Sequence, residues 1–426
     1  MDAEASDRLE SKSMTKFSVI FAGQAFSLFG SRLVQFALVW WLTSTSGLAS
    51  TLALASIMAL IPQVLLGPFA GTLVDRWNRR RVMIVADALI ALVVVTLGLL
   101  YALGVVKIWN IFAAMFLRSL LGAFHWPAMQ TTTTMIVPEK HLSRVAGLNQ
   151  SLQGLVNIVA PPLGAILLGF LPIQTILYID VSTAALAVAT LLFVSLPQPV
   201  IPEGKQRGWR SVLSDMREGM RFVWEWKGLR LIMMISMIIN LLVNPGFALL
   251  PILVTKHFGG GALELAWMQS AMGIGMILGG LTLGVWGGFR KRVVTAFSAI
   301  VVSGIFVIAI GVMPAHLFLY AVGSMFCFAF LNAIANGTFF ASMQSIVPPE
   351  IQGRVFTLLM SLSAGMVPLG MAVAGPVADA FGERIWFVVG GITFIILGIA
   401  AFFIPSIMNV EEEGTGNSPV GETLDT

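Results

Sequence analysis

The sequence predicts an all-α membrane protein with twelve transmembrane helices, arranged as two six-helix pseudo-repeated bundles. Three observations predict this class. Of the 426 residues, 57% are hydrophobic and only 11% are charged, whereas soluble domains carry roughly 25% charged residues. Twelve segments are apolar over roughly 20 residues, the length that a helix needs to cross a bilayer. A long polar connection divides these segments into two groups of six.

The chain is expected to fall into five parts. Residues 1–15 are polar, and we expect them to be disordered. The N-terminal bundle is expected over residues 16–196 and the C-terminal bundle over 229–405. Between them, residues 197–228 carry hydrophobic side chains at helical spacing, which predicts an amphipathic helix on the inner membrane surface; the alternative is an irregular linker. Residues 406–426 form an acidic tail that we expect to be disordered.

The twelve spans are expected at about 17–42, 48–74, 82–104, 108–134, 145–170, 172–196, 229–254, 264–288, 293–313, 316–342, 355–378 and 385–404. Of the 25 Lys and Arg residues, 20 then fall on the side of the N-terminus and 3 on the other side. Cytoplasmic loops carry the excess of Lys and Arg. We therefore expect a multi-pass protein of the cell membrane with both termini in the cytoplasm, and we assign the basic residues to orientation rather than to nucleic-acid binding.

The two halves show weak internal repetition. The sequence Ile-Val-Pro occurs at 136–138 and again at 346–348, and an Arg-Val pair follows each copy at the same distance. The stretch from Gly280 to Arg292 likewise echoes the stretch from Gly71 to Met83. Gly284 falls near the place of Asp75, so the second copy lacks the acidic member.

One basic loop, Gly71–Met83, holds a single carboxylate among four arginines. Asp75 ends the second span at the inner face, and it can dock on the positive N-terminal end of the eleventh span, near Arg354. Breaking that contact would release an inner gate. The alternative is a solvated loop charge that only fixes the topology. The candidate gating residues are Gly71, Asp75, Arg76, Arg79 and Arg80.

Several stretches resemble the major facilitator superfamily. The order of Gly71, Leu73, Asp75, Arg76, Arg79 and Arg80 resembles the signature of the loop between spans 2 and 3, with Asn78 where a glycine is usual. Arg118 to Gly122 is similar to a second signature. Residues 160–165 resemble an exporter signature in which Pro161, Pro162 and Gly164 kink the helix; Ala160 and Ala165 replace its glycines, and an ordinary packing kink is the alternative.

The resemblance extends over nearly the whole span region and is greatest to macrolide-efflux-type transporters. It implies a major facilitator fold, alternating access and drug–proton antiport. It also implies that spans 1, 7 and 10 line the substrate cavity.

Charged residues inside the spans are candidates for proton coupling. Arg118 lies within the fourth span, where a buried arginine is expensive and usually faces a partner in the bundle interior. Asp87 and Asp180 are the candidate titrating groups, and Arg118 would tune a nearby acid. A purely structural ion pair is the alternative for each of the three.

Polar residues at helical spacing mark the candidate substrate cavity. Any one of them can instead be a hydrogen bond between helices. The candidates come from five spans: Gln24, Ser27, Ser31, Arg32, Gln35, His125, Asn149, Gln153, Asn157, Asn240, Asn244, Asn332 and Asn336.

No enzyme motif appears in the sequence, and we expect neither a cofactor nor a metal ion. Three functions remain open. The first is a proton-coupled exporter of amphipathic compounds such as macrolide antibiotics, which would confer multidrug or antibiotic resistance and act as a monomer. The second is an exporter of a siderophore or another anionic metabolite, which Arg32 and Arg118 would favour. The third is a non-transporting receptor or lipid-binding scaffold.

Overall fold

The computed structural model describes residues 2–74, 77–194 and 209–411. All regular elements in these ranges are helical, and twelve helical segments there are long and apolar enough to cross a membrane. The predicted class, an all-α membrane protein with twelve spans, is confirmed. The chain divides into two compact units: unit 1 is Met1–Ser46 with Leu54–Trp209, and unit 2 is Gly47–Ala53 with Arg210–Thr426.

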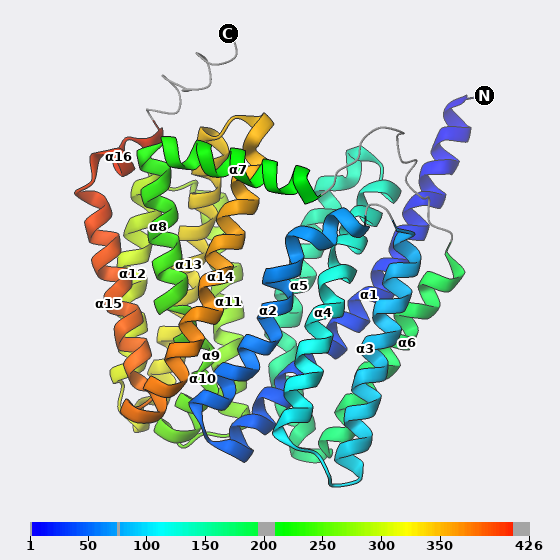
Figure 1. Ribbon diagram of the computed structural model, residues 1–426, viewed down its shortest axis with the longest axis horizontal. Coiled ribbons are helices and arrows are strands. Elements are labelled where there is room, and N and C mark those ends of the chain that lie inside the picture. The colour runs from blue at the N-terminus through cyan, green and yellow to red at the C-terminus, as the bar shows by residue number, and fades with distance from the viewer. Residues whose placement is uncertain (1, 75–76, 195–208, 412–426) are drawn as a thin grey trace. The chain divides into compact units, whose positions relative to one another are not determined.

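Unit 1 is a bundle of six helices (Figure 1), in which α1 packs on α6 and α3 packs on both α4 and α6. Two glycines of α1 permit its close approach to α6. A Cβ atom at Gly23 would lie 2.5 Å from Oγ1 of Thr190, and one at Gly30 would lie 3.0 Å from Oδ1 of Asp180. Without a hydrophobic driving force in lipid, such small residues let helices gain van der Waals contact. The six helices are α1 (Asp2–Ser46), α2 (Ala49–Val74), α3 (Arg79–Ala102), α4 (Ile108–Ile136), α5 (Glu139–Phe170) and α6 (Ile173–Phe193).

Unit 2 packs its long helices in the same way. A Cβ atom at Gly275 or Gly279 of α11 would collide with a backbone carbonyl oxygen of α13, and Gly304 of α12 faces Gly391 of α15. The segment Gly47–Ala53 belongs to this unit, because the Asp379 carboxylate accepts hydrogen bonds from two of its backbone N–H groups at 2.7 and 3.0 Å. The long helices are α8 (Lys227–Leu242), α11 (Ala262–Trp286), α12 (Arg292–Val312), α13 (Phe318–Ile346), α14 (Pro349–Phe381) and α15 (Arg384–Phe402), with a 3-10 turn η2 (Ala315–Leu317) before α13.

The seventh span is broken rather than continuous. We expected one helix over about 229–254, but α8 ends at Leu242 and is followed by α9 (Asn244–Ala248), α10 (Leu250–Ile252) and a π-helical turn η1 (Leu253–His257). Pro245 and Pro251 each stand in the first turn of a new segment. Proline has no N–H to donate and its ring clashes with the preceding turn, so it ends a helix at the residues before it.

In one pair of spans, the helix begins and ends at corresponding positions of the internal repeat. α4 covers Ile108–Ile136 and α13 covers Phe318–Ile346, so both ends differ by 210 positions. Val137 and Val347, which follow these helices, have nearly the same backbone angles, with φ −82° and ψ 125° against φ −83° and ψ 127°. The short Ile-Val-Pro match in the sequence therefore marks the same turn in each half.

The connecting segment contains α7 (Trp209–Glu225), a helix where the sequence predicts an amphipathic one. Phe222 and Val223 are buried in a hydrophobic cluster of unit 2. On the same helix, Glu218 forms an ion pair with Arg354 of α14 at 2.6 Å. One face of α7 thus packs on protein, and its contact with the membrane surface stays a prediction.

Two terminal segments that we expected to be disordered contain helix in part. The helix α1 begins at Asp2, in a stretch that contains no Gly or Pro, the two residues that most disfavour a helix. At the other end, we expected disorder from residue 406, and this is wrong for residues 406–411. There α16 (Pro405–Met408) forms, and Ile407 and Val410 have 0% exposure. Burial of two apolar side chains offsets the entropy of ordering so short a segment.

Candidate functional site

Unit 1 encloses a cavity of about 180 Å³ between α1, α3, α4 and α5. Its walls combine apolar side chains with a group of polar ones. Seven of the residues that line it were predicted from the sequence, six as cavity residues and Asp87 as a titrating group: Gln24, Ser27, Ser31, Asp87, His125, Asn149 and Gln153.

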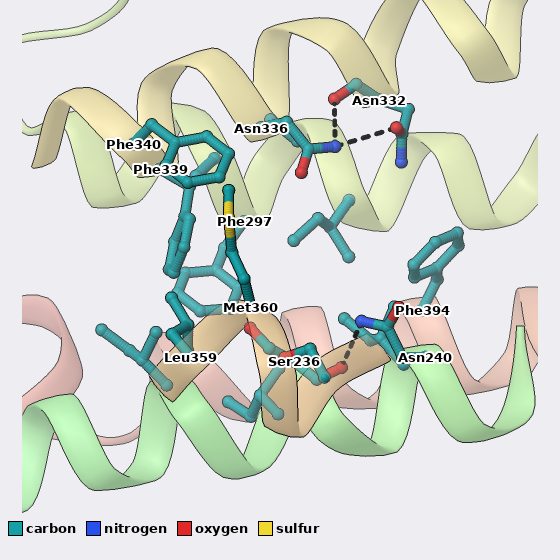
Figure 2. Close-up of a pocket in the computed structure, with 17 residues that line it drawn as sticks. Ser236, Asn240, Phe297, Asn332, Asn336, Phe339, Phe340, Leu359, Met360 and Phe394 are labelled. Carbon is teal, nitrogen blue, oxygen red and sulfur yellow. Dashed lines mark hydrogen bonds between the residues drawn. The ribbon is translucent and has the colours of Figure 1, made fainter. Parts of the chain in front are cut away.

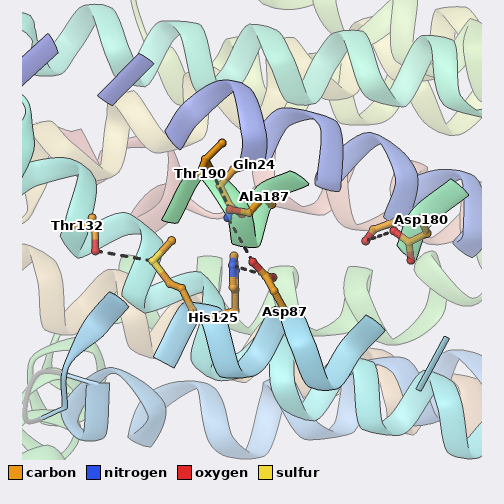
Figure 3. Close-up of polar contacts among 9 residues, drawn as sticks. Gln24, Asp87, His125, Thr132, Asp180, Ala187 and Thr190 are labelled. Atoms are coloured by element: carbon orange, nitrogen blue, oxygen red, sulfur yellow. Dashed lines mark hydrogen bonds and ion pairs between the residues drawn. The ribbon is translucent and has the colours of Figure 1, made fainter. Parts of the chain in front are cut away.

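Asp87 is the polar centre of this cavity. Its carboxylate lies 3.2 Å from Nε2 of His125 on α4 and accepts a hydrogen bond from the amide of Gln24 on α1 at 3.3 Å. Figure 3 shows the two partners converging on Asp87 from different helices. The Asp87 residue is 6% exposed. Three helices thus hold one buried acid, whose basic partner carries a charge only when its ring is protonated.

A second acid and base lie farther along the same bundle. Asp180 of α6 lies 3.3 Å from the guanidinium of Arg118 and accepts a hydrogen bond from the Ser31 hydroxyl at 3.1 Å. The Asp180 side chain is buried, at 3% exposure, and the Arg118 side chain is partly buried, at 13%. The absence of a Cβ at Gly30 leaves room for α6 to bring Asp180 against α1. The structure therefore pairs Arg118 with Asp180, and His125 with Asp87.

Three predicted cavity residues of unit 1 are not among those that line this cavity: Arg32, Gln35 and Asn157. Arg32 and Asn157 are exposed, and Gln35 is half-buried. Consecutive residues of a helix point in directions about 100° apart, so the polar side chains of α1 do not all face this cavity.

Unit 2 encloses a second cavity, also of about 180 Å³. Figure 2 shows Asn332 and Asn336 of α13 on one side of this cavity and Ser236 and Asn240 of α8 on the other, with phenylalanine rings at its two ends. No Asp, Glu, Lys, Arg or His is among the residues that line it, so this cavity offers uncharged amide and hydroxyl groups. The aromatic side chains in its wall are Phe297, Phe339, Phe340 and Phe394.

Two asparagine pairs, predicted from their spacing of four residues, use part of their hydrogen-bonding capacity on each other. The Asn336 amide donates to the side-chain oxygen of Asn332 at 2.9 Å, and the Asn244 amide donates to that of Asn240 at 2.7 Å. Asn244 itself does not line the cavity; it begins α9, directly after the break in the seventh span. Discontinuous helices are a common feature of transporter binding sites.

Of the predicted gating residues, Asp75 and Arg76 lie outside the described residues, so the gate stays a prediction. Gly71 lies near the end of α2, and the Arg79 residue is 8% exposed. The Arg80 guanidinium donates hydrogen bonds to the carbonyl oxygens of Leu191 and Leu192 at 2.7 and 2.6 Å. Arg80 therefore binds the C-terminal end of α6, where a cation is favourable.

The proline pair of the predicted exporter signature lies inside α5, which runs unbroken from Glu139 to Phe170. Pro161 is buried and Pro162 half-buried. A Cβ atom at Gly164 would lie 2.9 Å from the ring of Phe36 on α1. Gly164 thus serves the close packing of α5 on α1.

Sequence reasoning did not pair His125 with Asp87, and it missed the Ser363 hydroxyl. Ser363 lines the second cavity, and its buried oxygen has no hydrogen-bond partner among the described residues. The spacing of seven residues between Arg118 and His125 places both on one face of α4. This spacing could have indicated that both basic side chains face acidic residues inside the bundle.

Twelve apolar helices in two repeated units, each with a polar cavity inside the bundle, define a membrane transporter built from two halves. The chain belongs to the Major Facilitator Superfamily, whose family model matches residues 20–371.

Curated relatives agree with this family. The chain is 31% identical over 396 residues to macrolide efflux protein A of Streptococcus pyogenes, covering 93% of this chain and 97% of that protein. It is 30% identical over 316 residues to macrolide efflux protein A of Enterococcus faecalis, covering 74% and 97%. It is also 25% identical to the multidrug efflux pump Tap of Mycolicibacterium fortuitum, covering 90% and 94%.

Solved structures show the same fold. The nucleoside transporter NupG has a TM-score of 0.64 at 15% identity, covering 89% of this chain and 97% of that one. A bacterial homologue of the human lysosomal transporter Spinster has a TM-score of 0.65 at 14% identity, covering 94% and 97%. The predicted family and fold are therefore confirmed.

Proposed function

We propose that this protein exports amphipathic compounds such as macrolide antibiotics in exchange for protons, by alternating access. The similarity over 93% of the chain to a macrolide efflux protein supports the substrate class. In this proposal the protein acts as a monomer in the cell membrane, with both termini in the cytoplasm. The counts of Lys and Arg in its loops support that orientation.

The observation that carries proton coupling is the Asp87–His125 pair in the cavity wall. Both groups can take up or release a proton, and both border the space that a ligand would enter. An added positive charge disfavours protonation of its neighbours. An amphiphilic cation entering this cavity would therefore favour release of a proton from the pair, and its departure would favour proton uptake.

The energy available from one proton is sufficient for export. One charge moved across 100 mV supplies about 2.3 kcal/mol, and each tenfold concentration ratio of substrate costs about 1.4 kcal/mol. One proton per neutral substrate thus sustains a gradient of roughly 40-fold. Exchange of one proton for a monovalent cation moves no net charge, so the pH difference alone drives it.

The Arg118–Asp180 pair has a different part in this proposal. Arg118 is charged in every state of the cycle, so it supplies a permanent counter-charge 3.3 Å from the Asp180 carboxylate and joins α4 to α6. We therefore assign proton exchange to Asp87 with His125, and we assign Asp180 to positioning.

Proton release on ligand binding tests this function. The macrolide erythromycin is added to purified protein in weakly buffered detergent solution, and a pH indicator records the proton yield. We expect release from wild type and from Glu225→Gln, an acid on the surface of α7 that serves as the matched control. We expect Asp87→Asn to bind without releasing a proton. Binding with no proton release from the wild type would refute proton coupling.

Transport itself is measured in inside-out vesicles. Uptake of erythromycin should be abolished by an uncoupler and by Asp87→Asn. Vesicles that show no uncoupler-sensitive uptake of a macrolide or an amphiphilic cation would refute the exporter.

A second candidate substrate class is an anionic metabolite. Arg32 favours it, because this exposed arginine lies inside a membrane span and its side chain makes no hydrogen bond or ion pair with the described residues. Arg32→Gln should then abolish transport of an anion while sparing a cation. If Arg32→Gln leaves both unchanged, this candidate is eliminated.

A further inference from the structure

A third cavity lies at the surface of unit 1. It shares no lining residue with the Asp87 cavity, and the proposed function does not use it. It lies between the beginning of α3 and the later part of α4, and its volume is about 520 Å³. Pockets that bind small molecules measure roughly 300–1,000 Å³. We call it the α3–α4 groove; it is lined by Trp77, Asn78, Arg81, Val82, Val85, Ala86, Leu121 and Phe124.

The groove is apolar along its length and aromatic at one end. The rings of Trp77 and Phe124 stack with centroids 6.0 Å apart. Trp77 is 49% exposed and Val85 is 54% exposed, so this wall is open to the surroundings of the bundle. Tryptophan at the end of a span is typical of the membrane–water interface.

The charge of the groove comes from one arginine. Consecutive residues of a helix point in directions about 100° apart, so Arg79, Arg80 and Arg81 diverge. Arg79 is buried, and Arg80 binds the end of α6. Arg81 is exposed and lines the groove. Its guanidinium makes no hydrogen bond or ion pair with the described residues, and no acidic residue lines the groove.

Polarity changes in an ordered way along the groove. Arg81 and Asn78 lie beside the loop, and Val85 is one helical turn farther into the span, about 6 Å along the axis. Leu121 lies about one turn deeper in α4 than Phe124, because α4 runs toward the loop. A cation at the interface followed by an apolar channel toward the bilayer centre matches a lipid with an anionic headgroup.

We propose that the α3–α4 groove binds one anionic phospholipid of the cytoplasmic leaflet. The lipid phosphate lies on the Arg81 guanidinium, whose planar fork suits two hydrogen bonds to phosphate oxygens. The acyl chain follows Val82, Val85 and Leu121. The lipid thereby bridges α3 and α4, the two helices that contribute Asp87 and His125.

Titration with spin-labelled phosphatidylglycerol tests this site. Purified protein is mixed with the labelled lipid in detergent, and the immobilised fraction is measured against unlabelled phosphatidylglycerol or phosphatidylcholine as competitor. We expect one saturable site at which phosphatidylglycerol competes better than phosphatidylcholine. Arg81→Gln should weaken the site about fivefold, the contribution of one basic residue near an anionic membrane surface.

Two further variants separate the headgroup from the chain. Arg290→Gln removes an exposed arginine of unit 2 that does not line the groove, and it should leave the affinity unchanged. Val85→Trp fills the apolar channel at an exposed position, so it should weaken binding while the protein keeps its melting temperature. Equal competition by the two lipids, or equal losses in the two arginine variants, overturns the proposal. Displacement by erythromycin at least as strong as that by phosphatidylglycerol assigns the groove to substrate and also overturns it.

Discussion

Glu411 accepts a hydrogen bond from the backbone N–H of Arg292 at a distance of 3.3 Å, although 119 residues separate them in the chain. The same carboxylate accepts a hydrogen bond from the Ser342 hydroxyl. Glu411 thus joins the beginning of α12 to the end of α13. Arg292 ends the second copy of the repeated basic stretch, Gly280 to Arg292. That copy lacks an acidic residue, because Gly284 stands near the position that corresponds to Asp75.

Replacing Glu411 should loosen this end of unit 2. Glu411→Gln removes a charged acceptor, and hydrogen bonds to charged groups contribute about 1.5–3 kcal/mol. We expect a lower melting temperature in detergent. Glu225→Gln, which removes an exposed acid of α7, is the control and should leave the melting temperature nearly unchanged.

If Glu411 replaces the missing acid of the repeat, Gly284→Asp should partly rescue Glu411→Gln. A Cβ atom at Gly284 meets nothing within 4 Å, so an aspartate side chain fits there. A double variant no more stable than Glu411→Gln would show that the two positions are not equivalent.

The Arg118–Asp180 pair should respond differently to single and double substitution. Asp180→Asn leaves a buried guanidinium without its counter-charge, and breaking a buried pair costs about 3–5 kcal/mol. Asp180→Asn/Arg118→Gln removes both charges and should recover most of that stability. Thermal melting of purified protein measures both, and an unchanged melting temperature for Asp180→Asn would contradict the pairing.

Even the smallest side chain, that of alanine, should destabilise the protein at position 30. In Gly30→Ala the added methyl group would meet Oγ1 of Thr183 and lie 3.1 Å from the Cα atom of Asp180. Overpacking of this kind costs about 1–3 kcal/mol. Gly147→Ala is the control, because a Cβ atom there meets nothing within 4 Å and alanine favours the helix. Equal melting temperatures for the two variants would contradict the close approach of α1 and α6.

His125 should contribute to the proton yield of macrolide binding, because its ring lies 3.2 Å from the Asp87 carboxylate in the cavity wall. We expect His125→Gln to release fewer protons per bound erythromycin than the wild type, as measured with a pH indicator in weakly buffered solution. His316→Gln, at an exposed position of unit 2, should behave like the wild type. Wild-type behaviour of His125→Gln would remove His125 from the coupling.

The fold was predictable because the bilayer restricts it strongly. A chain segment in lipid must satisfy its backbone hydrogen bonds internally, so apolar runs of sufficient length become helices. The repeated Ile-Val-Pro turn was also visible, and it ends both α4 and α13. The break after Leu242 was missed, although Pro245 and Pro251 stand in the sequence, because apolar composition alone does not reveal where a span is interrupted.

The site was predictable only as a set of residue types. The sequence by itself determined that Asp87, Asp180, Arg118 and His125 lie within spans, because composition and length decide what the bilayer surrounds. Only the tertiary structure decided that Arg118 meets Asp180 while His125 meets Asp87. Such pairing depends on how each helix is rotated and how closely glycines let it approach its neighbour, and these contacts join residues far apart in the chain.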